Sequence, residues 1–247
     1  MLSFISQKLT NYLALALFAL ALFIAISIFP VPLLSDPISD AAGLSFTLLT
    51  DTAGKPFFLI TTALLCLLPV FFRLPKKQII KLWIQFAILL VLSFGAKTFL
   101  KHETAIPRPY TYELQRLNLI PSPQDFYQLD KVEKDNVVKK ASAYISTWRI
   151  RHWEGETNYS FPSGHTIFAA ICILFWGGFL LRTRHYILAG GLITWAVGVG
   201  ISRLWLGMHF PSDVMGSILS AAVLYLFIPE WKVDSETNTA YSQKINK

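Results

Sequence analysis

Three short stretches of the chain carry residues that could bind and transfer an acidic group. The stretch 202–213 places an arginine, a histidine and an aspartate between two strongly apolar segments. Pro211 is a favourable first residue of a helix, so Asp213 is expected in the first turn of that helix. From there Asp213 can reach back and orient the ring of His209 as a base or nucleophile. Arg203 offers a planar fork suited to phosphate oxygens. The alternative is an Arg203–Asp213 pair that closes a helix bundle.

The second stretch, 101–109, follows an apolar segment and contains Lys101 and Arg108. Pro107 and Pro109 keep Arg108 out of a helix and stiffen the chain around it. Taken alone, a lysine and an arginine here are more often anchors at a membrane surface than ligands.

The third stretch, 161–166, precedes another apolar segment. Ser163 is a good N-cap, Gly164 lets a ligand approach the backbone, and His165 can exchange a proton near neutral pH. Free amides at such a helix start favour an anion. The alternative is an ordinary capped helix with a surface histidine.

Together the three stretches predict phosphoryl transfer. Cations and amides stabilise charge on the phosphoryl oxygens, one histidine can attack phosphorus, and the other can protonate the leaving oxygen. Since no cluster of acidic residues suited to magnesium accompanies them, the cations are expected to replace a metal. Metal-dependent hydrolysis through His165 and His209 stays open as an alternative.

The elements that position these residues are expected to be membrane helices. Of the 247 residues, 53% are hydrophobic and 15% are charged, and the mean hydropathy is +0.48. A soluble domain of this length would be less apolar. We expect an all-α integral membrane protein with one domain, 1–247. The net charge of +7 is read as membrane orientation rather than nucleic-acid binding, because the basic residues lie between apolar runs.

Six apolar runs are near the length of about 20 residues that spans a bilayer. They are 12–29, 56–72, 79–100, 164–181, 186–208 and 211–228. A polar loop with three aspartates is expected between the first two runs.

Charge predicts the orientation of these six helices. With the N-terminus in the cytoplasm, the basic residues at 8, 73–81 and 182–184 and the tail 230–247 all fall inside. Segment 102–160 and the stretch around His209 then share the outer face.

Segment 102–160 contains an amphipathic pattern. Apolar residues recur at three-to-five-residue steps from Phe126 to Trp148, which predicts one helix, and Ser122-Pro123 is a plausible start. This helix could be a lid near a substrate entrance, or it could pack over the bundle for stability.

The three stretches resemble the three motifs of the type 2 phosphatidic acid phosphatase superfamily: K-x6-R-P, P-S-G-H and S-R-x5-H-x3-D. Every motif position is present in order. The resemblance implies a phosphohistidine mechanism in which His209 is the nucleophile, Asp213 orients it, and His165 is the general acid and base. It implies that five residues hold the phosphate, namely Lys101, Arg108, Ser163, Gly164 and Arg203.

The resemblance also implies a bacterial inner-membrane enzyme that needs no metal or other cofactor. Its active site would face the periplasm, with both termini cytoplasmic, and no protein partner is implied. The substrate would be a phospholipid or polyprenyl phosphate in the outer leaflet. Phosphatidylglycerol phosphate is favoured, with undecaprenyl pyrophosphate and phosphatidic acid as further substrates.

Several other functions are alternatives to this one. A dedicated undecaprenyl pyrophosphate phosphatase and a lipid phosphotransferase belong to the same superfamily. So do vanadate-binding haloperoxidases, but those are soluble. A transporter is a different class, but its charged residues would lie at mid-depth in helices interrupted in paired halves.

Overall fold

The computed structural model describes residues 2–31 and 33–229, in which every regular element is a helix. The tail 230–247 lies outside the described residues. Within the described residues, four helical segments are long and apolar enough to cross a membrane, and a bent pair of helices would make a fifth. The long segments are α1 (Leu2–Ile28), α4 (Lys76–Thr104), the continuous α9–η1–α10 (Gly164–Cys172, Ile173–Gly177, Gly178–Arg182) and α11 (Tyr186–Trp205). The shorter α12 (Pro211–Leu226) is also apolar.

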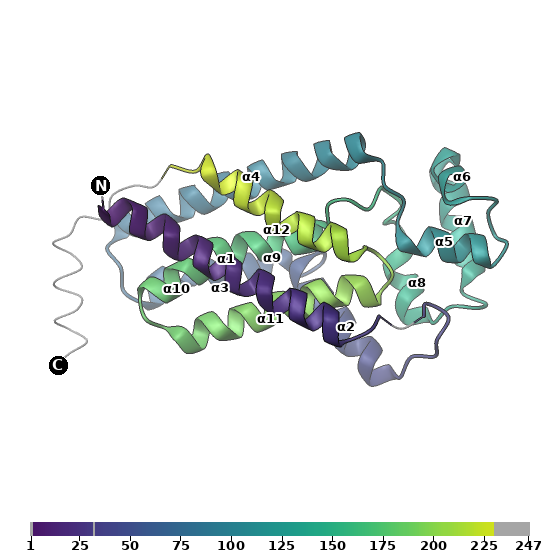
Figure 1. Cartoon of the computed structure of the whole chain (residues 1–247), viewed down its shortest axis with the longest axis horizontal. Coiled ribbons are helices and arrows are strands. Elements are labelled where there is room, and N and C mark those ends of the chain that lie inside the picture. Colours follow the sequence, from purple (N-terminus) through teal and green to yellow (C-terminus); the bar gives the residue numbers. More distant parts are fainter. Residues whose placement is uncertain (1, 32, 230–247) are drawn as a thin grey trace.

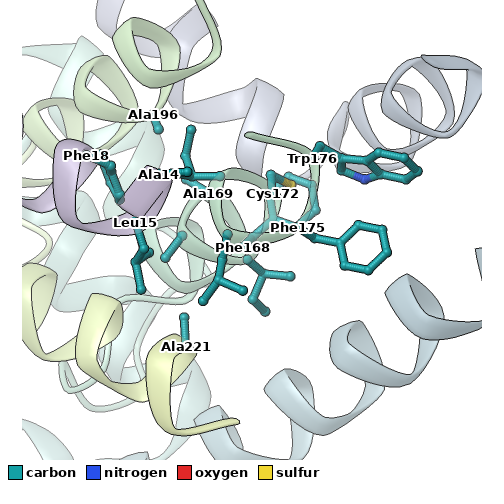
Figure 2. Close-up of a cluster of buried hydrophobic side chains, with 14 of the residues drawn as sticks. Ala14, Leu15, Phe18, Phe168, Ala169, Cys172, Phe175, Trp176, Ala196 and Ala221 are labelled. Carbon is teal, nitrogen blue, oxygen red and sulfur yellow. The ribbon is translucent and has the colours of Figure 1, made fainter. Parts of the chain in front are cut away.

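The α9–η1–α10 segment is the centre of the bundle. Of its most apolar stretch, 83% is buried, against 39% or less in the other three long segments. Figure 2 shows its Phe168, Ala169 and Cys172 among side chains of α1, α11 and α12. Such all-round burial accounts for its almost unbroken apolar sequence, because no face needs to be polar.

The prediction of a polar loop after the first helix was wrong. Residues Asp40–Ala53 form α2, which is followed after a 63° bend by α3 (Phe58–Phe71). Ser39 caps α2 at its start, and the ring of Phe46 stacks on Trp205 with 4.4 Å between centroids. The polar face of α2, with Thr47, Thr50 and Asp51, is buried against other polar groups. Tertiary contacts therefore hold a helix where the aspartates suggested a loop.

The prediction of a single helix from Phe126 to Trp148 was also wrong. Segment 102–160 contains four short helices: α5 (Pro109–Arg116), α6 (Pro123–Gln128), α7 (Lys131–Ala141) and α8 (Thr147–Trp153). Ser122 caps α6 as predicted, but Asp130 and Ser146 start new helices. Val132 and Tyr144, assigned to the apolar face, are 67% and 61% exposed. Strong capping residues inside the segment divided the helix.

The helices α5–α8 form a cap at one end of the bundle (Figure 1). Their core includes Tyr110, Phe126 and Trp153, and it continues into Leu206 and Met208 of the loop between α11 and α12. The fifth apolar run was predicted to extend to Met208, but α11 ends at Trp205. This end of the bundle, where α4 ends and α9 and α12 begin, brings the three predicted stretches together.

Close packing of α1 on α10 gives a testable consequence. A Cβ atom added at Gly178 would lie 2.0 Å from Oδ1 and 2.8 Å from Cα of Asn11. We expect Gly178→Ala to lower the free energy of unfolding by about 1–3 kcal/mol, because the backbones cannot approach as closely. Thermal unfolding in detergent measures this. The matched control is Gly190→Ala in α11, where nothing lies within 4 Å. An equal effect of both variants would contradict the packing.

Candidate active site

His209 lies in a tight loop between α11 and α12. Gly207 has φ +70°, and a Cβ there would lie 2.6 Å from Leu34 Cδ2, so a glycine is needed for both conformation and space. Pro211 then begins α12, as predicted. His209 is 3% exposed. The loop therefore presents one buried imidazole at the end of the bundle.

The two ring nitrogens of His209 face opposite kinds of group. Nδ1 lies 3.6 Å from Asp213 Oδ2 and 3.4 Å from Ser160 Oγ. Nε2 lies 3.4 Å from Nη1 of Arg108. Asp213 therefore reaches back to the ring, as its place in the first turn predicted.

Burial first, and then the positive charges of Arg108, Arg203 and Lys101, hold the pKa of His209 well below its usual value. The ring consequently stays neutral as the pH falls through about 6.5, where a free histidine takes up a proton. A neutral imidazole has a lone pair available for attack.

Arg108 is buried and fully occupied by protein groups. Its Nε donates to Asn158 O at 2.7 Å, and its Nη1 to Met208 O at 3.2 Å besides the His209 contact. Its Nη2 donates to Glu156 Oε2 at 2.9 Å and to Asn158 Oδ1. These contacts match the five N–H groups of a guanidinium. A phosphate can bind Arg108 only by displacing one of them, and Glu156 and Asn158 are the exposed partners.

Four cationic side chains act on the carboxylate of Glu156. Burial alone would raise this pKa, but Arg108 and then Arg203, Lys101 and Lys97 bring it below the usual value. Glu156 is therefore an ionised carboxylate held where positive charge converges.

Arg203 and Lys101 keep donors for a ligand. Arg203 Nη1 donates to Thr50 Oγ1 of α2 at 2.6 Å, whereas its buried Nε has no partner among the described residues. Lys101 Nζ donates to the carbonyls of Tyr159 and, at 3.2 Å, Ser160. The Arg203–Asp213 pair, which was the alternative to a phosphate-binding role, does not occur among the ion pairs of the described residues.

Ser163, Gly164 and His165 lie at the start of α9. Ser163 caps the helix, as predicted, and its Oγ accepts from the backbone N–H of Thr166 at 3.3 Å. A Cβ at Gly164 would lie 2.9 Å from Lys97 Cδ, and one at Gly54 would lie 2.0 Å from His165 Nε2. Lys97 and the bend between α2 and α3 therefore border this part of the site.

The cap holds the His209 loop by its backbone. Four successive carbonyls accept hydrogen bonds from cap groups: Trp205 from Arg149 Nε at 3.1 Å, Leu206 from Trp153 Nε1 at 2.7 Å, Gly207 from Tyr110 N at 3.0 Å, and Met208 from Arg108. These hydrogen bonds fix the backbone of the loop against the cap.

No group of three or more histidine, cysteine or acidic side chains suited to a metal occurs among the described residues. The cations and hydroxyls that converge on the site suit a phosphoryl group.

Four residues of the site were missed from the sequence: Thr50, Glu156, Asn158 and Ser160. Ser160 directly precedes the 161–166 stretch, and its position there was a usable signal. The other three lie at no spacing that a pattern would reveal, and Thr50 lay in the supposed loop.

Comparison with known proteins identifies a family. The PAP2 superfamily matches residues 81–236. Phosphatidylglycerophosphatase B of Haemophilus influenzae is 36% identical over 194 residues, which are 73% of this chain and 80% of that protein. Phosphatidylglycerophosphatase B of Escherichia coli is 36% identical over 182 residues, 71% and 70% of the two chains. Undecaprenyl-diphosphatase BcrC of Bacillus subtilis is 40% identical over 70 residues, 28% and 33% of the two chains.

The chain therefore belongs to the PAP2 superfamily. By class it is a phosphatase.

The carboxylate on Arg108 gives a prediction. Glu156→Gln removes a negative charge that competes with phosphate, so we expect inorganic phosphate to inhibit about twofold to fivefold more tightly. The inhibition constant measures this. Glu154→Gln, at a nearby exposed carboxylate, should change it little. Weaker phosphate inhibition in Glu156→Gln would show that the carboxylate supports the site instead.

The closeness of Gly54 to the ring of His165 gives a second prediction for the site. Gly54→Ala should push the His165 ring aside and lower the turnover number about a hundredfold, because a displacement near 1 Å is enough to misalign a proton donor. Phosphate inhibition should be unchanged. Gly95→Ala on α4, where nothing lies within 4 Å, is the control. Full activity in Gly54→Ala would remove His165 from the reaction.

Proposed function

We propose that the chain hydrolyses the terminal phosphate of membrane lipids through a phosphohistidine at His209. The observation that carries this proposal is the arrangement of His209, whose Nε2 faces the buried cations while Nδ1 faces the Asp213 and Ser160 side. A neutral imidazole oriented in this way can attack phosphorus with its Nε2 lone pair.

In the first step, the contact of Arg108 Nη1 with Nε2 of His209 is released. Nε2 then forms a bond to phosphorus, and the bond from phosphorus to the lipid oxygen breaks. His165 donates a proton to that oxygen. In the second step, water gives its proton to His165 and its oxygen attacks phosphorus, so the N–P bond breaks and phosphate leaves. Asp213 orients His209 throughout.

The developing charge on the phosphoryl oxygens is stabilised by donors from four elements. Arg203 has an unpaired Nε, and Lys101 comes from the last turn of α4. Ser163 and Gly164 supply the start of α9, and Arg108 joins when Glu156 is displaced. Cations that meet the charge in a buried site do the work of a metal ion.

The substrate is a lipid because the site lies at the end of a membrane bundle. We assign six crossings, by α1, the α2–α3 pair, α4, α9–η1–α10, α11 and α12, within one domain, 1–247. The cap 102–160 lies on the periplasmic side, and the start of α4, with its lysines, lies on the cytoplasmic side of a bacterial inner membrane. Both termini are then cytoplasmic.

Phosphatidylglycerol phosphate is the favoured substrate, because the relatives matched over most of the chain are phosphatidylglycerophosphatases B. Undecaprenyl pyrophosphate is the second candidate, because BcrC, named an undecaprenyl-diphosphatase, shares 40% identity over 70 residues. Phosphatidic acid would fit the same phosphate site.

Turnover of a lipid panel by purified enzyme tests the proposal. We expect phosphate release from phosphatidylglycerol phosphate in the presence of a chelator, and His209→Ala should lose at least about a thousandfold in turnover number. A much faster rate with undecaprenyl pyrophosphate would select the second substrate. Loss of activity with the chelator would contradict the metal-free mechanism.

A further inference from the structure

Ser160 is a buried hydroxyl fixed at the centre of the site. It is 0% exposed. Its backbone N–H donates to Ile106 O at 2.8 Å, and its carbonyl accepts from Lys101 Nζ at 3.2 Å. The backbone of Ser160 is therefore held from both sides, which leaves its side chain little freedom.

The Ser160 hydroxyl lies between the histidine and the aspartate. Oγ donates a hydrogen bond to Asp213 Oδ2, and it lies 3.4 Å from His209 Nδ1 and 3.5 Å from Met208 O. A hydroxyl has one proton and two lone pairs. Because the closest partner is a carboxylate that can only accept, the proton points to Asp213 and a lone pair remains for Nδ1.

The direct contact between His209 and Asp213 is longer. Nδ1 and Oδ2 are 3.6 Å apart, beyond the usual range of a hydrogen bond. Oδ2 already accepts from Ser160 and from the backbone N–H of Phe210 at 2.8 Å. The other oxygen, Oδ1, has no partner among the described residues.

The opposite side of the ring fixes the same proton position. Arg108 can only donate, so Nε2 of His209, 3.4 Å from its Nη1, is the acceptor and carries no proton. In the neutral ring the proton must then be on Nδ1, where it faces Ser160 and Asp213.

We propose that Ser160 is a positioning residue through which Asp213 orients His209. The Nδ1–H of His209 donates to Ser160 Oγ, and the Ser160 O–H donates to Asp213 Oδ2. This inference rests on the proposed function, in which Nε2 attacks phosphorus. When the N–P bond forms and the bond to the lipid oxygen breaks, the Nδ1 proton stays on the ring. The positive charge that develops there is stabilised by the aligned hydroxyl and carboxylate.

Kinetics of Ser160→Ala test this directly. We expect the turnover number to fall about 10- to 100-fold, because a hydrogen bond to a charged group is lost, while KM and phosphate inhibition stay the same. Ser160→Thr keeps the hydroxyl and should recover most of the rate. Ser93→Ala removes a buried hydroxyl of α4 that bonds Leu90 O at 2.7 Å, and it should keep full activity. Full activity in Ser160→Ala would overturn the proposal.

A double-mutant cycle with Asp213→Asn tests whether Asp213 orients His209 through Ser160 or whether the two residues support the site separately. If Asp213 acts through the hydroxyl, Ser160→Ala should cost little further in the Asp213→Asn background. Additive losses would show that the two residues act separately, and that would overturn the proposal.

The ring nitrogens of His209 give a readout that needs no turnover. In enzyme labelled with ¹⁵N-histidine, the His209 signals, assigned by their loss in His209→Gln, should show one Nδ1–H tautomer in the wild type. Ser160→Ala should show a mixture. A wild type that holds this tautomer but hydrolyses no lipid phosphate would defeat the proposed function and leave the role of Ser160 intact. An unchanged tautomer in Ser160→Ala would overturn the role of Ser160 and leave the proposed function intact.

Discussion

Three guanidinium groups are buried at one end of an apolar bundle, and the site depends on how their charges are met. Arg108, Arg149 and Arg203 are each at most 1% exposed. A buried charge is costly unless it is paired and hydrogen-bonded. Arg149 meets this cost with backbone carbonyls, and Arg108 meets it with both carbonyls and side chains. Each of the two donates to a carbonyl at the loop that carries His209. Arg203 keeps an unpaired Nε. Nη2 of Arg149 likewise has no partner among the described residues, so two of the three buried guanidinium groups keep an unpaired donor.

The residues of the site come together because five elements have an end at the same place. α4 supplies Lys101, α9 supplies the helix start at Ser163, α11 supplies Arg203, and α12 supplies Asp213, while α2 contributes the Thr50 hydroxyl to Arg203. The cap closes over them and donates to four loop carbonyls in succession. A helix bundle alone would leave these carbonyls in a poorly solvated place, so the cap and the site stabilise each other.

The sequence predicted the chemistry better than the architecture. The proline at 211 and the spacing to Asp213 placed the carboxylate near His209, because local helix geometry decides that contact. The same local rules failed for α2, since its polar residues are turned inward to partners far along the chain, such as Arg203. They failed again in the cap, where Asp130 and Ser146 restart helices within one apolar pattern. Ser160 and Glu156 were missed because their roles come from contacts with residues about 50 positions away.

Covalent phosphorylation of His209 is tested most directly by rapid quenching of the enzyme with a ³²P-labelled lipid phosphate, followed by peptide mapping. We expect an alkali-stable, acid-labile label on the peptide that contains His209, formed and lost at rates that match turnover. Turnover without any such label, or a label on another residue, would contradict it.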